Sequence, residues 1–351
     1  MKNLLTLLLK SQHQRKRSGL AQTEKGMTLI ELLIGTVMAF LIITPMLGFV
    51  VDMLNTDRRE QIKTNTEQDI QAATDFIAQD LSQAIYIYDN DTIYNAAPDG
   101  TVGIRAQLPN PVNGTPILVF WKREQIRNAV SVNTTTRVLP NACNANNCND
   151  TYVRSLVAYY QINNPDPIWC QPLVNCPTRI ARYEIKEGVR NPDSADPNQP
   201  YYDDTQANSG QQVSEGFNPN FNFRTPRLNV TLGNNAFPPS QVLVNYIDHS
   251  PLPAAQVPTG LQCQTLLGVT PPTGPGAPAF DPNDLLIKDT SANSAHSFYA
   301  CVDTQKNLAR VTIRGNSLRR LQPKDADYNA NKSAFFPTAT VQVQGLGARG
   351  K

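Results

Sequence analysis

One apolar run constrains this chain more than any other feature. Residues 27–51 contain a single ionisable side chain, Glu31, among 25 residues. A helix needs roughly 20 apolar residues to cross the hydrocarbon of a bilayer, so the run is long enough to span a membrane. A carboxylate in hydrocarbon is unfavourable by several kcal/mol unless a partner neutralises it. The sequence therefore predicts a membrane-spanning helix in which Glu31 is paired.

Charges on either side of the run predict its orientation. Residues 1–26 contain six basic side chains and one acidic one, a net charge of +5, whereas Asp52 and Asp57 follow the run. By the positive-inside rule, residues 1–26 lie in the cytoplasm and the chain beyond the run faces outward. A secretory signal would have an apolar core of about 7–15 residues before a small-x-small cleavage site, which residues 52–57 do not offer. A plain signal anchor would explain the orientation but not Glu31.

The residues at the start of the run resemble a known processing signal. Gly26-Met27-Thr28-Leu29-Ile30-Glu31-Leu32-Leu33 is similar to the cleavage and methylation signal of type IV prepilins. The resemblance implies that a membrane peptidase removes residues 1–26 as a leader peptide and that Met27 becomes the N-methylated first residue. Glu31 then takes the acidic fifth position. Met27 replaces the usual phenylalanine, and the long leader is more typical of pseudopilins and minor pilins than of major pilins.

The new amine of Met27 and the carboxylate of Glu31 would lie about one helical turn apart on one face. Within a single helix this pair has poor geometry, because the amine lies at the helix end. Between neighbouring subunits staggered along a filament, the two desolvated charges can neutralise each other. We therefore expect Glu31 to set the register of assembly rather than to act in catalysis.

The helix is expected to continue beyond the membrane to about Tyr86. Residues 55–69 are polar apart from Ile62 and contain no Gly or Pro, and several are good helix formers. An apolar stripe then recurs at steps of three and four, as in a helix packed on a folded domain; it comprises Ile70, Ala73, Ile77, Leu81, Ala84 and Ile85. We expect a membrane half at 27–51, which Pro45 and Gly48 interrupt or kink, and an amphipathic half at 52–88.

After residue 88 the pattern changes to short alternating segments between Pro, Asn, Asp and Gly residues. This pattern predicts a β-rich exported head over residues 89–351. Strands are expected at 102–108, 116–121, 152–161, 179–186, 241–247, 297–302, 308–314 and 338–344, with long loops at 187–226 and 251–284. The expected fold class is α+β, with the long N-terminal helix packed on an antiparallel head, which the resemblance identifies as type IV pilin-like.

All six cysteines lie in the outward part: Cys143, Cys148, Cys170, Cys176, Cys263 and Cys301. Their even number and their export favour disulfides. Fifteen pairings exist in principle, and pairing between nearest neighbours (143–148, 170–176 and 263–301) is the simplest. The last of these resembles the C-terminal loop staple of pilins. Zinc is the alternative, but the spacings miss the usual zinc-knuckle pattern.

No motif of the exported part predicts catalysis. Asp248-His249-Ser250 contains the residue types of a catalytic triad, but adjacent residues of an extended chain point to opposite faces and cannot form one alone. GxSxG and HExxH motifs do not occur. We therefore expect no catalytic residues, no enzyme activity and no cofactor.

Metal and nucleic-acid binding are also not expected. Asp89-Asn90-Asp91 begins like a calcium loop, but Ile93 and Tyr94 occupy positions that need a ligand and a glycine. A looser calcium site is the remaining alternative, among Asp193, Asp196, Asp203 and Asp204. The net charge of +2 for the chain, less +5 for residues 1–26, leaves −3, which argues against a general nucleic-acid-binding surface.

Five further segments resemble the cyanobacterial hormogonium polysaccharide secretion pseudopilins, within the broader W/J type of minor pilins: 56–60, 68–73, 85–89, 309–316 and 336–344. The resemblance implies a minor pseudopilin of a type IV pilus or type II secretion-like machine that supports polysaccharide secretion and gliding motility. Implied partners are the prepilin peptidase/methylase, other pilins or pseudopilins and the inner-membrane assembly platform. The implied location is the inner membrane in a single pass, with the N-terminus cytoplasmic and the head periplasmic, or extracellular within a filament.

Two other functions fit the same sequence. A pilus-tip adhesin would display an exposed aromatic or loop patch that binds glycan or a surface. A membrane-tethered exported enzyme would contain a convergent polar pocket in the head.

Overall fold

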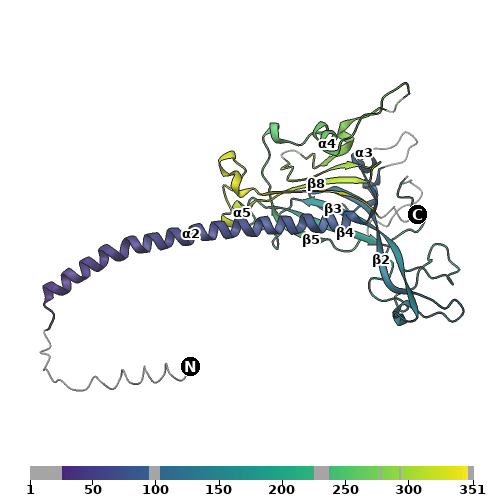
Figure 1. The fold of residues 1–351 in the computed structure, drawn as a ribbon, viewed down its shortest axis with the longest axis horizontal. Coiled ribbons are helices and arrows are strands. Elements are labelled where there is room, and N and C mark those ends of the chain that lie inside the picture. The colour runs from purple at the N-terminus through teal and green to yellow at the C-terminus, as the bar shows by residue number, and fades with distance from the viewer. Residues whose placement is uncertain (1–25, 95–102, 225–236, 277–278, 292–293, 347–351) are drawn as a thin grey trace, which may run out of the picture. The chain divides into compact units, whose positions relative to one another are not determined.

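The computed structural model describes residues 26–94, 103–224, 237–276, 279–291 and 294–346. The chain divides into two compact units, one ending at Arg58 and the other beginning at Arg59. Helix α2 (Leu29–Ser82) begins in the first unit and ends in the second. Both β-sheets belong to the second unit, which we term the head (Figure 1). The layout is therefore α+β, as the sequence predicts.

The part of α2 inside the head buries one face. Because 3.6 residues complete a helical turn, the buried residues recur mostly at steps of three and four; they are Thr66, Ile70, Ala73, Thr74, Ile77, Asp80 and Leu81. The predicted apolar stripe is thus confirmed over residues 70–81. The prediction that the helix reaches Tyr86 is wrong, because α2 ends at Ser82 and the next residues form strand β1 (Ala84–Ile87).

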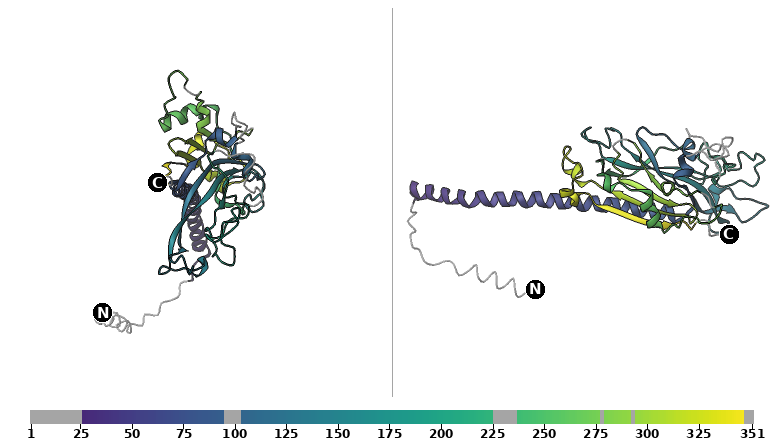
Figure 2. Two further views of the ribbon diagram at one scale, coloured as in Figure 1. Left: turned by 90° about the vertical axis from the view of Figure 1, so that its right-hand side faces the viewer. Right: turned by 90° about the horizontal axis from the view of Figure 1, so that it is seen from above.

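The described residues of the head form two antiparallel sheets, seen from two further sides in Figure 2. The first has the order β1-β2-β3-β4-β5, in which the later strands are β2 (Gly114–Ser131), β3 (Cys148–Ile162), β4 (Thr178–Lys186) and β5 (Gln241–Ile247). The second has the order β6-β7-β8-β9, formed by β6 (Leu286–Lys288), β7 (Phe298–Asp303), β8 (Leu308–Arg314) and β9 (Thr338–Gln344). Within each sheet, every strand therefore pairs with its neighbours in sequence, whereas β5 and β6 lie in different sheets.

One hydrophobic core joins α2 to both sheets. Ile77 of α2, Phe120 of β2 and Phe298 of β7 all belong to it and are fully buried. Trp121, next to Phe120 in β2, is also buried, since it packs against a cluster of phenylalanines with ring centroids about 6 Å away, Phe217, Phe221 and Phe223. Both faces of β2 are thus covered, which explains its continuous apolar run.

A buried ion-pair network fixes α2 on the first sheet. Asp80 accepts hydrogen bonds from Lys122 Nζ at 3.0 Å, from Arg182 Nε at 2.8 Å and from Tyr159 Oη at 2.6 Å. Glu184 pairs with the same two cations, at 3.2 Å from Lys122 and 2.7 Å from Arg182. Buried charges are tolerated when they are paired and hydrogen-bonded in this way.

The beginning and the end of the head meet beside α2. Asn307 Nδ2 donates to the carbonyl oxygens of Ala84, at 2.9 Å, and of Gly345, at 3.1 Å. The backbone N–H of Leu346 donates to the carbonyl oxygen of Ser82 at 3.0 Å. Residues from the two ends of the head are therefore linked directly.

Two predicted segments differ from the structure. The strand expected at 102–108 is wrong where the structure describes it, because residues Ile104–Gln107 form a 3₁₀ helix. The loop expected at 251–284 contains helix α4 (Gly260–Leu267). Thr259 and Gln262 form a reciprocal capping box at its start, and Gly268 ends it in the left-handed conformation, with a φ of 60°. Two short helices also flank the sheets, α3 (Asn90–Tyr94) and α5 (Ser317–Leu321).

Candidate functional site

The start of α2 brings the predicted processing and assembly residues together. Gly26 and Met27 precede the helix, and Glu31 lies in its first turn. The backbone N–H of Glu31 donates to Thr28 Oγ1 at 3.3 Å and to the Thr28 carbonyl oxygen at 3.0 Å. Thr28 thereby caps the helix, which satisfies one of the donors that a helix start leaves without a partner.

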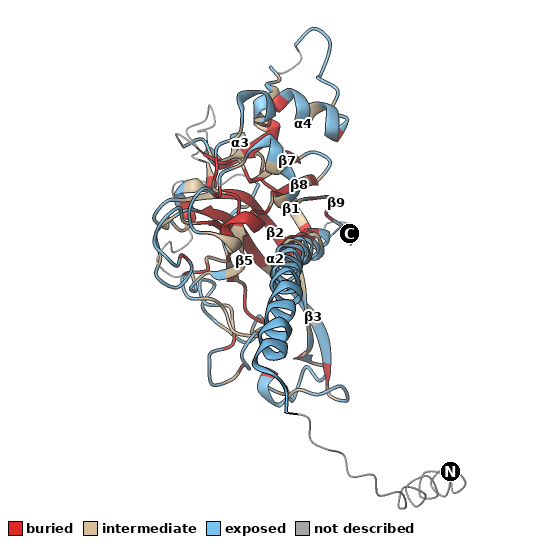
Figure 3. Cartoon of the chain, turned by 90° about the vertical axis from the view of Figure 1, so that its left-hand side faces the viewer, coloured by how far each residue is buried: buried red, intermediate tan, exposed pale blue. Residues whose placement is uncertain are grey.

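The side chains that follow are apolar and exposed. Among the described residues, α2 is the one helix long and apolar enough to cross a membrane, and none of its most apolar window is buried. In Figure 3 the first half of the helix has the colour of exposed residues. Exposure of such an apolar surface to water is unfavourable, so the surface is expected to contact a lipid bilayer or other apolar helices. The helix fits a single-pass membrane protein.

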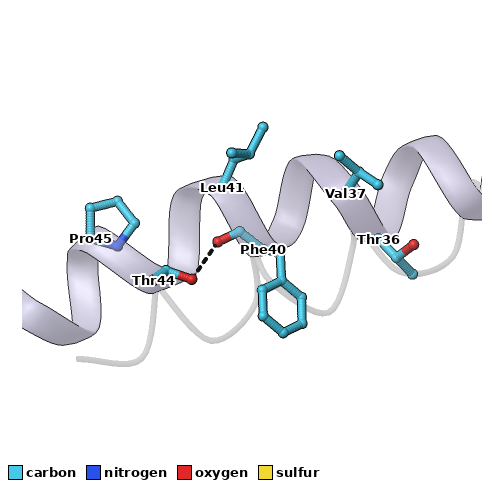
Figure 4. A pocket seen from close by; sticks show the side chains of 6 residues that line it. All are labelled: Thr36, Val37, Phe40, Leu41, Thr44 and Pro45. Carbon is cyan, nitrogen blue, oxygen red and sulfur yellow. Dashed lines mark hydrogen bonds between the residues drawn. The ribbon is translucent and has the colours of Figure 1, made fainter.

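Helix α2 continues through Pro45 and Gly48, so these residues do not interrupt it, whereas a kink at this point stays a prediction. Proline has no N–H to donate to the carbonyl of Leu41. Close to this position, Thr44 Oγ1 donates to the carbonyl oxygen of Phe40 at 2.8 Å (Figure 4). The surface here has a hollow of about 620 Å³, lined entirely by α2: Thr36, Val37, Phe40, Leu41, Thr44 and Pro45. A hollow formed by one helix is a lipid or helix contact surface rather than an enclosed site.

The six cysteines form three disulfides, Cys143–Cys148, Cys170–Cys176 and Cys263–Cys301. These pairings are the nearest-neighbour ones. The first two close small loops, whereas the third connects helix α4 to strand β7. Disulfides persist in oxidising compartments, so the head fits an exported location.

The triad residue types do not form a catalytic site. Asp248 is fully buried and pairs with Arg314 at 2.7 Å. Ser250 Oγ donates to Asp248 Oδ1 and accepts from the backbone N–H of Tyr328. Neither ring nitrogen of His249 forms a hydrogen bond to another described residue. Burial lowers the pKa of His249 more than the carboxylates of Asp248 and Asp327 raise it. Ser250 is therefore hydrogen-bonded to a carboxylate that pairs with Arg314, and not to the imidazole of His249.

The acidic candidates for calcium have structural partners. Asp89 Oδ1 accepts from the backbone N–H of Thr92 at 2.9 Å, and Asp193 pairs with Arg137 at 2.6 Å. Asp203 Oδ1 accepts from Thr205 and Gln206 in a turn. Over the described part of the chain, no three His, Cys, Asp or Glu residues gather in a way that would hold a metal ion.

Sequence reasoning missed two groups of residues that organise the head. Asp80 was not included in the apolar stripe, although an acid between Ile77 and Leu81 signals a buried ion pair. Trp169 and Phe76 were not considered, although they lie on one exposed groove.

Comparison of the chain with protein-family models, with curated proteins and with solved structures gives no match.

Proposed function

We propose that this chain is a minor pseudopilin, a structural subunit of a type IV pilus or type II secretion-like machine. The placement of Glu31 carries the proposal. It is the one ionisable residue of an exposed apolar helix segment, and it lies in the first turn directly after Gly26-Met27. A carboxylate there has a use when a neighbouring subunit supplies an amine.

The rest of the fold supports the proposal. The first half of α2 is apolar and exposed, whereas the second half packs on an antiparallel head with three disulfides. A chain of this kind suits a subunit that is first anchored in a membrane by its helix and later packs that helix against the apolar helices of other subunits. We propose that the N-terminus is cytoplasmic before cleavage and that the head is periplasmic, or extracellular within a filament.

Partners and cargo follow from the sequence resemblance. We propose that the chain is processed by a prepilin peptidase/methylase and assembles with other pilins or pseudopilins on an inner-membrane platform. We propose a role in polysaccharide secretion and gliding motility because segments such as 309–316 and 336–344 are similar to cyanobacterial pseudopilins.

Mapping of the mature N-terminus tests the proposal. We expect mass spectrometry of the membrane-extracted chain to find N-methylated Met27 as the first residue, and Gly26→Ala to leave more uncut precursor. Gly35→Ala is the matched control, because an added Cβ meets no atom within 4 Å at either glycine. A defect confined to Gly26→Ala therefore reflects recognition by the peptidase rather than a change in fold. A mature terminus at any other residue contradicts the proposal.

A further inference from the structure

A groove of about 650 Å³ lies on the head between α2, β5 and the segment before the Cys170–Cys176 disulfide. Its apolar side chains include Phe76, Ile168 and Trp169, which are 41%, 76% and 36% exposed. Soluble surfaces rarely leave such large apolar side chains together without a use. The volume falls within the roughly 300–1,000 Å³ of small-ligand sites.

The segment that carries Trp169 is held rigidly. The Trp169 carbonyl oxygen accepts from Asn245 Nδ2 at 3.0 Å, and the disulfide begins at the next residue. Arg319, which is 3% exposed, donates to the carbonyl oxygens that follow, those of Pro172, Val174 and Asn175, at 3.1, 3.0 and 2.8 Å. A surface ordered before binding loses little conformational entropy when a ligand arrives.

Polar groups line the same groove. Arg320 pairs with Asp69, and its guanidinium carbon lies 4.6 Å from the ring centroid of Tyr246. Two polar atoms of the groove residues, Asn245 Oδ1 and Arg320 Nε, are buried and form no hydrogen bond with any described residue. Buried polar atoms normally have a partner. Neither atom is accessible from the groove, so the polar groups that a ligand can reach are those of the Asp69–Arg320 pair, whose side chains are 48% and 20% exposed.

We propose that this groove binds a short stretch of a neutral carbohydrate chain. A pyranose ring has an apolar C–H face that can pack on the electron-rich faces of Trp169 and Phe76. Its hydroxyl groups can donate to the carboxylate of Asp69 and accept from the guanidinium of Arg320. The Asp69–Arg320 pair leaves the groove without net charge, which favours a neutral sugar over a uronic acid. A purely apolar protein surface would instead remove the Asp69–Arg320 pair from water without offering it a hydrogen bond.

The two tryptophans of the chain make the proposal testable. Trp121 is 1% exposed in the core, whereas Trp169 lies in the groove, so acrylamide quenches mainly the fluorescence of Trp169. The full chain would be studied in a detergent without a sugar headgroup, with maltohexaose, cellohexaose, laminarihexaose and mannohexaose as probes. At least one of these is expected to protect Trp169 from acrylamide in a saturable manner. Protection by none of them overturns the proposal.

Variants identify the groove as the site of protection. Phe76→Ala and Asn245→Ala retain both tryptophans, and each is expected to weaken binding of the protecting sugar about ten-fold. Trp169→Ala should abolish retention of the chain on the same sugar immobilised on a resin. Tyr152→Ala is the control, because Tyr152 is a 52% exposed aromatic residue outside the groove. Unchanged sugar binding by Phe76→Ala and Asn245→Ala overturns the proposal. Protection of Trp169 that depends on the protein concentration alone also overturns it, because a second copy of the chain would then be the occupant of the groove.

This inference goes beyond the proposed function, and its failure is distinguishable from a failure of filament assembly. The groove belongs to the head, whereas cleavage and incorporation depend on residues near the start of α2. Trp169→Ala is therefore expected to show the same mature N-terminus and the same share in filaments as the unaltered chain.

Discussion

Glu31 raises the question of which effect keeps a carboxylate at the start of an apolar helix. Its position in the first turn is favourable, because the helix dipole stabilises a negative charge there by about 0.3–1 kcal/mol. Transfer of an unpaired charge into hydrocarbon is unfavourable by roughly 2.5–3.5 kcal/mol or more. The dipole alone is therefore insufficient, and a partner charge is the stronger explanation.

Replacement of Glu31 separates insertion from assembly. Glu31→Leu makes the helix more apolar, so we expect membrane insertion to persist or improve. Incorporation into filaments should fall to near background, since the amine of a neighbouring subunit would remain unpaired in hydrocarbon. The measurement compares the membrane pool with the sheared filament pool, and Glu31→Asp, which retains the charge, is the control. Normal incorporation of Glu31→Leu would limit Glu31 to recognition by the processing enzymes.

Some individual residues can be proposed from the sequence and others cannot, for a physical reason. The proposed processing residues, Gly26 and Met27, form one short contiguous motif with Glu31, so a prediction for them can be made from the chain alone. Asp80 is different, because its partners Lys122 and Arg182 are 42 and 102 residues away in sequence. Only the folded sheet brings these charges together. The groove residues Phe76, Trp169 and Asn245 are likewise far from one another along the chain.

Elements were predictable where one local pattern dominates. Strands β5, β8 and β9 have the predicted bounds. In β8 and β9 the apolar residues alternate with polar ones, which matches the one face that each strand buries. Helix α2 ends early because pairing of β1 with β2 overrides the continuing helical period. Helix α4 carried a local signal, the Thr259 to Gln262 capping box and Gly268, but its proline-rich surroundings favoured a loop.

The Cys263–Cys301 disulfide is expected to stabilise the head more than either of the others. Its sequence separation is 38, against 5 for Cys143–Cys148. The chain-entropy model gives about 4 kcal/mol for the longer loop and about 2 kcal/mol for the shorter one. Replacement of each pair by serine, followed by urea unfolding with Trp121 fluorescence as the signal, measures the difference. Equal losses for the two double variants would refute the dependence on loop length.

At the scale of the whole molecule, the class of fold was predictable but the arrangement of strands was not. Local patterns reveal that strands exist, whereas their division into two sheets depends on contacts such as that of Phe298 with Gln161, which are far apart in sequence. The short strand β6 has only three residues, too few to show a period. Pairing between sequence neighbours is nevertheless the commonest arrangement of antiparallel strands.

Acid is expected to lower the free energy of unfolding of the head, because it protonates Glu184. Burial alone would raise the pKa of this carboxyl, but the hydrogen bond from Arg182 and the charges of Lys122 and Arg182 lower it from 4.5 to about 2. The folded state thus prefers the ionised form. Its contribution to stability is fully present above pH 4.5 and is lost as the pH falls from about 4.5 towards 2.

Replacement of Glu184 is expected to make the unfolding free energy less dependent on pH in the acidic range. Within that window we expect Glu184→Gln to reduce the pH dependence of the unfolding free energy by up to about 1.4 kcal/mol per pH unit. Urea unfolding at a series of pH values measures this slope. Glu215→Gln, at an exposed position, should leave the slope unchanged. An unchanged slope for Glu184→Gln would show that other carboxyls govern acid unfolding.

The link that Asn307 forms between Ala84 and Gly345 has a consequence for biosynthesis. Its two acceptors are separated by most of the head, so the link cannot form until nearly the whole chain has been made. At about 5–20 residues per second, translation from one acceptor to the other takes roughly 13–52 s. The first sheet, on which α2 packs, is complete at Ile247, but the core that it shares with β6 to β9 is not. A cell that makes this protein is therefore expected to hold a head with an incompletely covered core while the last strands are still being synthesised.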